Sequence, residues 1–182
     1  MSEQFPRLDD RLSQFIEAQK IFFVGSAAAD GRVNVSPKGQ DSLRILSPTE
    51  ILWMNLTGSG NETAAHLLES DRITLMWCAF EGPPMILRAY GTAAVFHPRD
   101  ARFEEFSRQL PATVGTRQYL LVTIDLVQTS CGYAVPFMDY VEDRTVLSKW
   151  AEKRGPTGIS DYWQEKNQTS LDGRPTGVLE NL

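Results

Sequence analysis

Two short segments carry side chains that could bind a charged small molecule. The first is residues 34–39 (Asn-Val-Ser-Pro-Lys-Gly). It closes a predicted strand and contains a hydroxyl, a cation and a flexible glycine. Such a set can hold a phosphorylated or electron-rich heteroaromatic ligand, because it combines a strong donor charge, a hydroxyl and unpaired backbone amides. A solvated turn with an exposed lysine is the competing interpretation, since turns favour the same residue types.

The second segment, residues 56–63 (Leu-Thr-Gly-Ser-Gly-Asn-Glu-Thr), is a glycine-rich loop that leads into a predicted helix. Free amides and the positive end of a helix dipole favour a phosphate at such a place. The loop is not a P-loop, because no GKS or GKT follows, and it is not a GxGxxG motif. An ordinary capped helix after a glycine turn is equally consistent with it. The Glu62 carboxylate would oppose a phosphate here unless it points away.

A third segment, residues 130–136 (Ser-Cys-Gly-Tyr-Ala-Val-Pro), contains a cysteine that could be a nucleophile. Only His66 and His97 could serve as its imidazole base, and neither has a recognisable partner motif. A packed structural role is therefore the preferred interpretation of Cys131. The only other cysteine, Cys78, is too distant in sequence to form a metal-binding pair with it.

The composition is that of a globular protein and excludes several function classes. The 182 residues are 42% hydrophobic and 23% charged, with a formal net charge of −5. This charge argues against nucleic acid or an anionic membrane as the main partner. No apolar run approaches the roughly 20 residues that span a bilayer. Residues 1–14 are polar and do not resemble a signal peptide, so we expect a cytoplasmic protein with reduced thiols.

Apolar periodicity places the three segments on a mainly β scaffold. Predicted strands cover residues 21–28, 33–37 (after an Asp30-Gly31 hairpin turn), 42–46, 51–56, 73–77, 85–96 and 119–127, with 130–137 as a candidate continuation. Predicted helices cover residues 7–19, 61–68, 97–110, 143–154 and 160–166. Strands and helices do not alternate regularly, which disfavours a doubly wound fold. We therefore predict one domain over residues 1–182, an antiparallel split β-barrel with peripheral helices and a C-terminal helical and tail extension from about 143 to 182. The polar tail from Asn167 is expected to be ordered only by packing on a partner.

The order and spacing of these segments resemble the pyridoxamine 5′-phosphate oxidase-like, FMN-binding split-barrel family. A strand pair across residues 30–31 ends in Ser-Pro-Lys-Gly, and a later strand leads to Thr57 and the Gly-Ser-Gly-Asn loop. Residues 87–93 (Leu-Arg-Ala-Tyr-Gly-Thr-Ala) resemble the R-x-x-G strand of that family. Residues 130–136 and the stretch 166–173 resemble one of its branches. The likeness covers roughly residues 15–140.

The resemblance implies a homodimer with FMN in a cleft between the subunits, and a small-molecule substrate. The implied cofactor-binding residues are Val35, Ser36 and Lys38 on one side of the cleft, Leu56 and Thr57 at the ring or ribitol, Asn61 and Thr63 on the phosphate side, and Ser130, Cys131 and Gly132 where the partner chain approaches the flavin. No metal ligand and no catalytic acid or base is identified.

The sequence also departs from that family's pattern. The pyridoxamine oxidase itself carries an Arg-Lys pair where this chain has Glu62 and Thr63, and an arginine where this chain has Val33. We expect helix amides, Thr63, Lys38 and Arg44 to replace this cationic phosphate clamp. The Arg/His-bearing C-terminal segment that binds the vitamin phosphate is also absent. The sequence therefore does not predict oxidation of pyridoxamine 5′-phosphate.

The resulting functional prediction is an FMN-dependent oxidoreductase acting on an unidentified small molecule. The flavin would perform the redox chemistry, with Lys38 stabilising negative charge on the reduced ring or on the phosphate. The same fold could bind a deazaflavin or haem, although it lacks a dense basic groove and a clear axial ligand. Two alternatives from other classes are a flavin carrier or sensor without turnover, and an interaction protein that has lost its cofactor.

Overall fold

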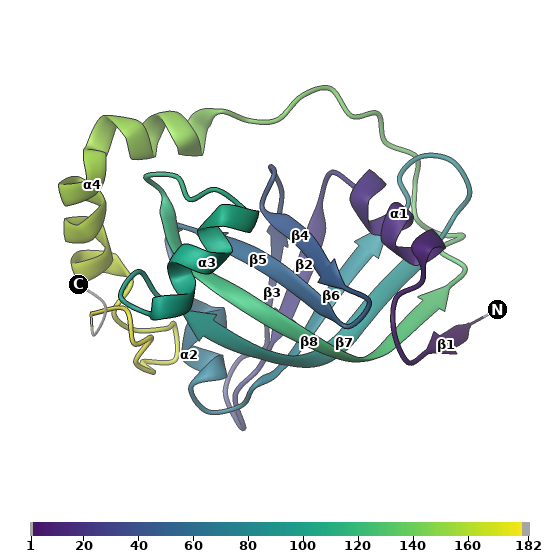
Figure 1. The fold of residues 1–182 in the computed structure, drawn as a ribbon, viewed down its shortest axis with the longest axis horizontal. Helices are drawn as coiled ribbons and strands as arrows, with labels where there is room; N and C mark the ends of the chain where they lie inside the picture. The colour runs from purple at the N-terminus through teal and green to yellow at the C-terminus, as the bar shows by residue number, and fades with distance from the viewer. Residues whose placement is uncertain (1, 180–182) are drawn as a thin grey trace.

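The computed structural model describes residues 2–179, which form an antiparallel eight-stranded sheet with four helices around it (Figure 1). The strands are β1 (Glu3–Phe5), β2 (Phe22–Ser26), β3 (Asn34–Lys38), β4 (Leu43–Ser47), β5 (Glu50–Leu56), β6 (Arg72–Cys78), β7 (Ile86–Phe96) and β8 (Thr116–Ser130). The helices are α1 (Asp10–Ala18), α2 (Glu62–Leu67), α3 (Ala101–Gln109) and α4 (Val146–Lys166). The predicted mainly antiparallel β class with peripheral helices is confirmed. None of these helices has the length and apolar character needed to cross a bilayer.

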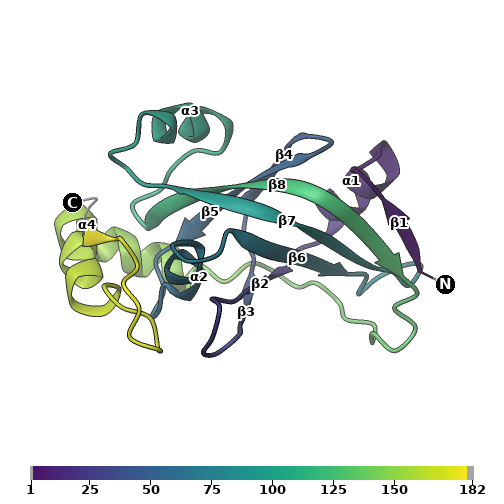
Figure 2. The ribbon, with the colours of Figure 1, turned by 90° about the horizontal axis from the view of Figure 1, so that it is seen from below.

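The sheet curls around one main core. Its strand order is β3-β2-β6-β7-β8-β5-β4, so three strands separate β2 from β5. Nevertheless, the ring of Phe22 on β2 lies 6.3 Å from that of Trp53 on β5, edge to face. Phe22 also stacks on Trp77 of β6, with ring centroids 6.0 Å apart. The two ends of the sheet are therefore brought towards each other around these aromatic side chains, and Figure 2 shows the resulting curvature of β7 and β8.

Strand β5 and the first half of β8, residues 116–122, are buried on both faces. Ile51 and Trp53 point into the main core, whereas Leu52 and Met54 belong to a second cluster outside it. Phe106 of α3 covers this outer face. Alternate side chains of one strand thus enter two cores, which explains why the sequence of β5 is a continuous apolar run.

Most predicted elements are observed, and the differences have local causes. The strand predicted to continue through residues 130–137 is wrong, because β8 ends at Ser130. Gly132 has φ +60°, a conformation that favours glycine, and its carbonyl accepts a hydrogen bond from the Val135 amide in a turn. The short strand β1, which pairs with the end of β8, was not predicted. The two predicted C-terminal helices are the halves of α4, which is kinked at Gly155.

The segment after α4, residues 167–179, packs on its own chain, and we call it the C-terminal hook. Asn167, Ser170, Thr176 and Val178 are all buried. The prediction that this tail would be ordered only on a partner is therefore wrong. Figure 1 shows how residues 131–145 lead from the end of β8 back across the molecule, so that α4 and the hook lie at the α2 end of the sheet.

Candidate functional site

A cavity of about 550 Å³ lies where β3, the loop before α2, the start of β8 and the hook meet. This volume falls within the range of small-molecule sites. Its lining residues are Asn34, Ser36, Lys38, Asn55, Gly58, Ser59, Gly60, Asn61, Glu62, Thr63, Arg117, Thr169, Ser170 and Leu171. We call it the anion cavity, for the reasons given below.

Strand β3 supplies one wall of the anion cavity through alternate side chains. Asn34, Ser36 and Lys38 line it, as the two-residue period of a strand requires. Val35 lies on the opposite face of β3 and is 66% exposed. The strand tolerates Pro37 because it is at the edge of the sheet, where no further strand needs the missing amide.

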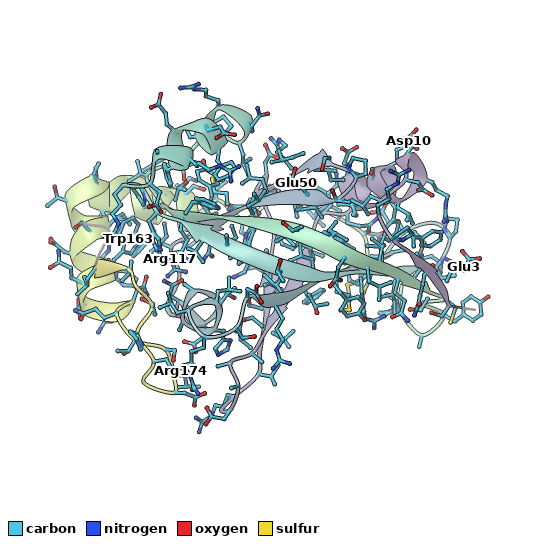
Figure 3. The ribbon with its side chains drawn as sticks, turned by 60° about the horizontal axis from the view of Figure 1, so that its bottom comes forward. Glu3, Asp10, Glu50, Arg117, Trp163 and Arg174 are labelled. Atoms are coloured by element: carbon cyan, nitrogen blue, oxygen red, sulfur yellow. The ribbon has the colours of Figure 1, made fainter. Side chains whose placement is uncertain are left out.

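Arg117, the second residue of β8, places a buried cation in the cavity wall. The residue is only 3% exposed, and burial lowers the pKa of its guanidinium to about 9. Its Nη1 donates to the Gly60 carbonyl at 2.9 Å and to Asn167 Oδ1 at 2.6 Å. Within residues 2–179 no carboxylate pairs with it, and its buried Nε has no hydrogen-bond partner. A buried charge without a counter-ion is costly, which favours an anionic ligand beside it. Figure 3 shows Arg117 beside Trp163, at the α4 end of the sheet.

Lys38 is a second cation at the same cavity. Burial and, to a smaller extent, the positive charge of Arg117 lower the pKa of its ammonium to about 8. Its Nζ lies 5.2 Å from the ring centroid of Trp53, a cation–π distance. No carboxylate in the described part of the chain pairs with it. Two uncompensated cations therefore face one cavity, although the net charge of the protein is negative.

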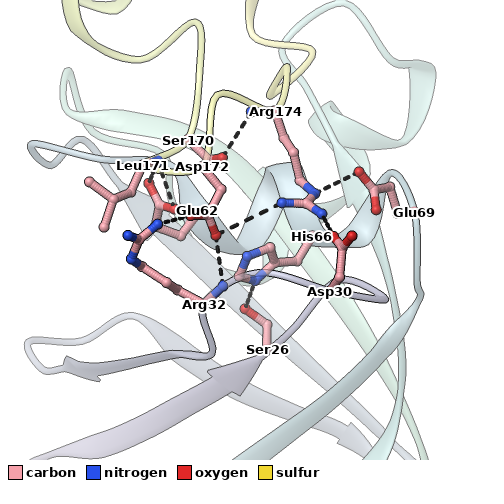
Figure 4. A network of polar contacts seen from close by, with 10 residues as sticks. All are labelled: Ser26, Asp30, Arg32, Glu62, His66, Glu69, Ser170, Leu171, Asp172 and Arg174. Carbon is pink, nitrogen blue, oxygen red and sulfur yellow. Dashed lines mark hydrogen bonds and ion pairs between the residues drawn. The ribbon is translucent and has the colours of Figure 1, made fainter.

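Thr63, at the start of α2, is held by a buried polar network. Its hydroxyl oxygen accepts from Asn34 Nδ2 at 3.2 Å and from Ser26 Oγ at 3.3 Å. The Ser26 oxygen also lies 3.0 Å from His66 Nδ1, a contact drawn in Figure 4. His66 therefore has a structural role, while the hydroxyl hydrogen of Thr63 remains available to a ligand in the cavity.

Other polar residues of this region are occupied by the protein itself. Asn61 exchanges long hydrogen bonds with Gln118, at 3.5 and 3.3 Å, and makes no side-chain bond to the helix that it precedes. The Thr57 hydroxyl donates to the Gly115 carbonyl at 2.9 Å and accepts from Trp163 Nε1 at 2.8 Å. Thr57 thus joins the start of β8 to α4, which gives it a structural function.

The hook covers Glu62, the residue that sequence reasoning found unfavourable for a phosphate. Both oxygens of its carboxylate accept from the Leu171 amide at 3.1 Å. Next to it, the Asp172 carboxylate accepts from the Arg32 amide at 2.7 Å and forms an ion pair with the Arg32 guanidinium. The hook backbone therefore partly satisfies the acid at the cavity rim (Figure 4).

Arg174 fixes the other side of the hook. Its Nε donates to Glu69 at 2.8 Å, and its Nη2 pairs with Asp30 in the turn between β2 and β3. The hook approaches this turn so closely that a Cβ atom on Gly31 would lie 2.6 Å from Asp172 Oδ2. A side chain here would displace the Asp172 carboxylate, and the φ of +84° of Gly31 favours glycine.

The ten predicted cofactor residues fall into four groups in the structure. The anion cavity is lined by Ser36, Lys38, Asn61 and Thr63. An adjoining cavity of about 300 Å³ is lined by Leu56 and Thr57. The two cavities share the lining residues Lys38, Asn55 and Gly58. Val35 faces outward, and Ser130, Cys131 and Gly132 lie at the far end of β8. Arg117 and Ser130 are separated by roughly 40 Å along that strand, at about 3.3 Å per residue. A single chain therefore does not bring the last three to the cavity.

Sequence reasoning missed Arg117 and the hook, and it chose the wrong arginine. Arg44, expected to help replace the cationic clamp, pairs with Asp41 and does not line the anion cavity. The available local signal was Arg117 itself, a charged residue at the start of a segment that is otherwise apolar and β-forming. Its partner Asn167 lies fifty residues further along the chain, which no local pattern reveals.

Comparison with known proteins agrees with the fold and the order of the site segments. Residues 8–131 match the family model described as pyridoxamine 5′-phosphate oxidase. The chain belongs to this family. It is 36% identical over 189 residues to the pyridoxamine 5′-phosphate oxidase family protein ustO of Aspergillus flavus, covering 94% of this chain and 76% of that protein. The hook lies outside the residues that match the family model.

Solved structures share the fold at low sequence identity. HupZ of Group A Streptococcus aligns with a TM-score of 0.54 at 15% identity, over 67% of this chain and 98% of that one. A candidate pyridoxamine 5′-phosphate oxidase of Lactobacillus delbrueckii gives 0.54 at 18% identity, over 68% and 94%. An FAD binding protein of Mycobacterium smegmatis gives 0.50 at 8% identity, over 69% and 97%. The predicted split-barrel family is thereby confirmed.

Proposed function

We propose that this protein binds FMN and is an oxidoreductase, with the flavin phosphate in the anion cavity. The observation that carries the proposal is the pair of cations, Lys38 and Arg117, that face this cavity without a carboxylate partner in residues 2–179. Membership of the pyridoxamine 5′-phosphate oxidase family supports a flavin as the ligand, and one structural neighbour is an FAD binding protein.

The donors present suit a phosphate monoester. Arg117 lines the cavity with its buried guanidinium, Lys38 with a compact ammonium and Thr63 with a hydroxyl group. Charge-assisted hydrogen bonds of this kind are the strong ones, especially where the donors are already desolvated. Glu62 remains the only acid in the lining, and its bond to the Leu171 amide reduces its repulsion of the phosphate.

The flavin would supply the hydride or electron transfer, and the protein would bind it, orient it and exclude water. Lys38 lines both the anion cavity and the adjoining cavity beside Trp53. In that place its ammonium can stabilise negative charge on the phosphate or at the ring. We assign no residue the role of catalytic acid or base.

We further propose a homodimer in which the partner's residues complete the site. The segment after β8 exposes large apolar side chains, namely Tyr133, Phe137, Met138, Tyr140 and Val141. Such a concentration is typical of a protein interface. Because Ser130, Cys131 and Gly132 directly precede this segment, a second copy docked on it could bring them to the first copy's flavin. The exposed free Cys131 favours a reducing, cytoplasmic location.

The decisive experiment is an absorption spectrum of the purified protein before and after addition of FMN and desalting. We expect the paired near-ultraviolet and blue bands of an oxidised flavin, and tighter binding of FMN than of riboflavin, which lacks the phosphate. Equal affinity for both would contradict the phosphate assignment, and preferred FAD binding would change the cofactor. A haem or deazaflavin spectrum, or a colourless protein that ignores FMN, would refute the proposal. Bound FMN that NADH and NADPH do not reduce would favour a carrier or sensor.

A further inference from the structure

A third cavity, of about 630 Å³, lies beneath the first turns of α4. Strand β5, the connection between α3 and β8, and α4 form its walls. Its lining residues are Gln40, Asp41, Met54, Leu56, Leu110, Pro111, Ala112, Thr113, Val114, Gly115, Leu147, Ser148, Ala151 and Glu152. We call it the apolar cavity.

The apolar cavity adjoins the proposed flavin site. It shares Gln40, Met54, Leu56 and Leu147 with the adjoining cavity described above. That cavity in turn shares Lys38 with the anion cavity. The three cavities therefore form one row, with cations at one end and aliphatic side chains at the other.

The two ends of this row have opposite electrostatic character. The anion cavity presents Lys38 and Arg117, whereas the apolar cavity contains no lysine or arginine among its described lining residues. Its charged members are both acids, Asp41 and Glu152. Asp41 forms an ion pair with Arg44, a residue that does not line the cavity. The carboxylate of Glu152 on α4 is therefore the negative charge that disfavours an anionic ligand.

Helix α4 presents a coherent face to the apolar cavity. Leu147, Ser148, Ala151 and Glu152 are spaced one, three and one residues apart, so they share one side of the helix. The opposite wall is formed by Met54, whose side chain is 5% exposed, and by the buried Leu110. A ligand here would contact mostly aliphatic groups, with a hydroxyl or amine directed to Ser148 or Glu152 at the rim.

From these shared walls and this charge pattern we propose that the apolar cavity binds the small-molecule substrate, a largely apolar compound without phosphate or carboxylate that is neutral or carries an amine. This inference rests on the proposed function, because the adjoining flavin site makes the ligand a substrate. The volume is that of a drug-sized small-molecule site, and its acidic rim disfavours phosphorylated vitamers. The two cations at the other end are left for the cofactor.

The test uses three probes with one skeleton: 4-phenylbutylamine, 4-phenylbutanol and 4-phenylbutyrate. Binding to the FMN-supplemented full-length protein is measured by titration calorimetry and ligand-observed NMR. The variant Ser148→Trp fills the cavity from α4, and Lys149→Trp is the matched control on the next residue, which lines none of the cavities described here. Neither residue contributes to the anion cavity.

We expect the amine and the alcohol to bind the parent protein and Lys149→Trp, and the butyrate to bind much more weakly. Ser148→Trp should weaken amine binding at least about tenfold, since a phenyl group loses its buried surface, while FMN affinity stays unchanged. Equal binding of amine and butyrate, or an unaffected Ser148→Trp, would overturn the inference. Failure of FMN to bind would refute the proposed function instead, because the three probes still report on the cavity in the flavin-free protein.

Discussion

Arg117 Nη1 donates a hydrogen bond to Asn167 Oδ1 at 2.6 Å, which joins the start of β8 to the first residue of the C-terminal hook. The Asn167 side chain also donates from Nδ2 to the Gly58 carbonyl at 3.0 Å, so it fixes the loop before α2 as well. Its own carbonyl accepts from Thr176 Oγ1 at 2.5 Å. The hook therefore sets the orientation of the buried cation at the anion cavity.

Replacing Asn167 by aspartate should weaken FMN binding. The nearly isosteric Asn167→Asp change places a carboxylate where the amide oxygen accepts from Arg117 and gives that cation an internal counter-ion. We expect a loss of about 1–3 kcal/mol in FMN binding, the range for charged hydrogen bonds. Riboflavin binding, measured by fluorescence titration, should change much less. An equal loss for both ligands would show that the substitution distorts the cavity as a whole.

Removing the Arg117 charge should have a similarly selective effect. Arg117→Met keeps an apolar stem while deleting the donors, and we expect FMN affinity to fall by about 10–100-fold. The matched control is Arg108→Met on α3, because Arg108 forms an exposed ion pair with Glu104 and lines none of the cavities described here. Flavin affinities of the two variants are compared by equilibrium dialysis. Unchanged FMN binding in Arg117→Met would refute the assignment of the phosphate.

FMN affinity should decrease as pH rises through about 8. Lys38 has a pKa lowered to about 8 by burial, and only its protonated form attracts the phosphate. Titrations between pH 6.5 and 8.5 measure this effect below the pKa of about 9 of Arg117, and Lys38→Met should bind FMN more weakly throughout and lose most of the dependence in this range. A parent protein whose affinity is flat across this range would contradict the role of Lys38.

Stability of the flavin-free protein should respond to pH in the opposite direction. Because the folded-state pKa of Lys38 lies below its ordinary value of 10.5, the unfolded chain binds more protons between about pH 8 and 10.5. The Lys38 contribution to the free energy of unfolding therefore rises with pH across this window. Urea unfolding of the parent protein and Lys38→Met isolates this contribution as the difference between the two pH profiles. An identical slope for both proteins would rule it out.

Arg174→Ala should release the hook without unfolding the barrel. The change removes the contacts of Arg174 with Asp30 and Glu69, which lie on two different segments. We expect faster amide exchange and several-fold faster limited proteolysis within residues 167–179, with FMN affinity reduced because Asn167 becomes less fixed. Arg108→Ala, which removes an exposed ion pair on α3, is the control and should leave both unchanged. Identical exchange in the two variants would show that Arg174 does not hold the hook.

The β scaffold was predictable because its signals are local. The strands predicted over residues 33–37 and 51–56 from alternation and from a continuous apolar run are observed as β3 and β5. The same alternation predicts which face of β3 carries Ser36 and Lys38. It also places Val35 on the opposite face, as observed, whereas the resemblance assigned Val35 to the site because it gives positions without a side-chain direction.

The cation clamp and the hook were not predictable from such signals. The role of Arg117 depends on two tertiary contacts. Its guanidinium donates to the Gly60 carbonyl and to Asn167 Oδ1. Likewise, Glu62 is unfavourable in the sequence but is capped by an amide from residue 171 in the structure. These pairings join residues 50 and 109 positions apart, so they depend on tertiary packing.

The hook also determines which fragments of this protein can form the complete anion cavity. A fragment cut at residue 131, where the family match ends, would lose Trp163 and Asn167 together. Thr57 would then lack its indole donor, Arg117 would lose one of its two acceptors, and the cavity would open along the side formed by Thr169, Ser170 and Leu171. The core that matches the family model therefore does not form the anion cavity alone: part of the cavity wall and one of the two acceptors of Arg117 come from the last quarter of the chain.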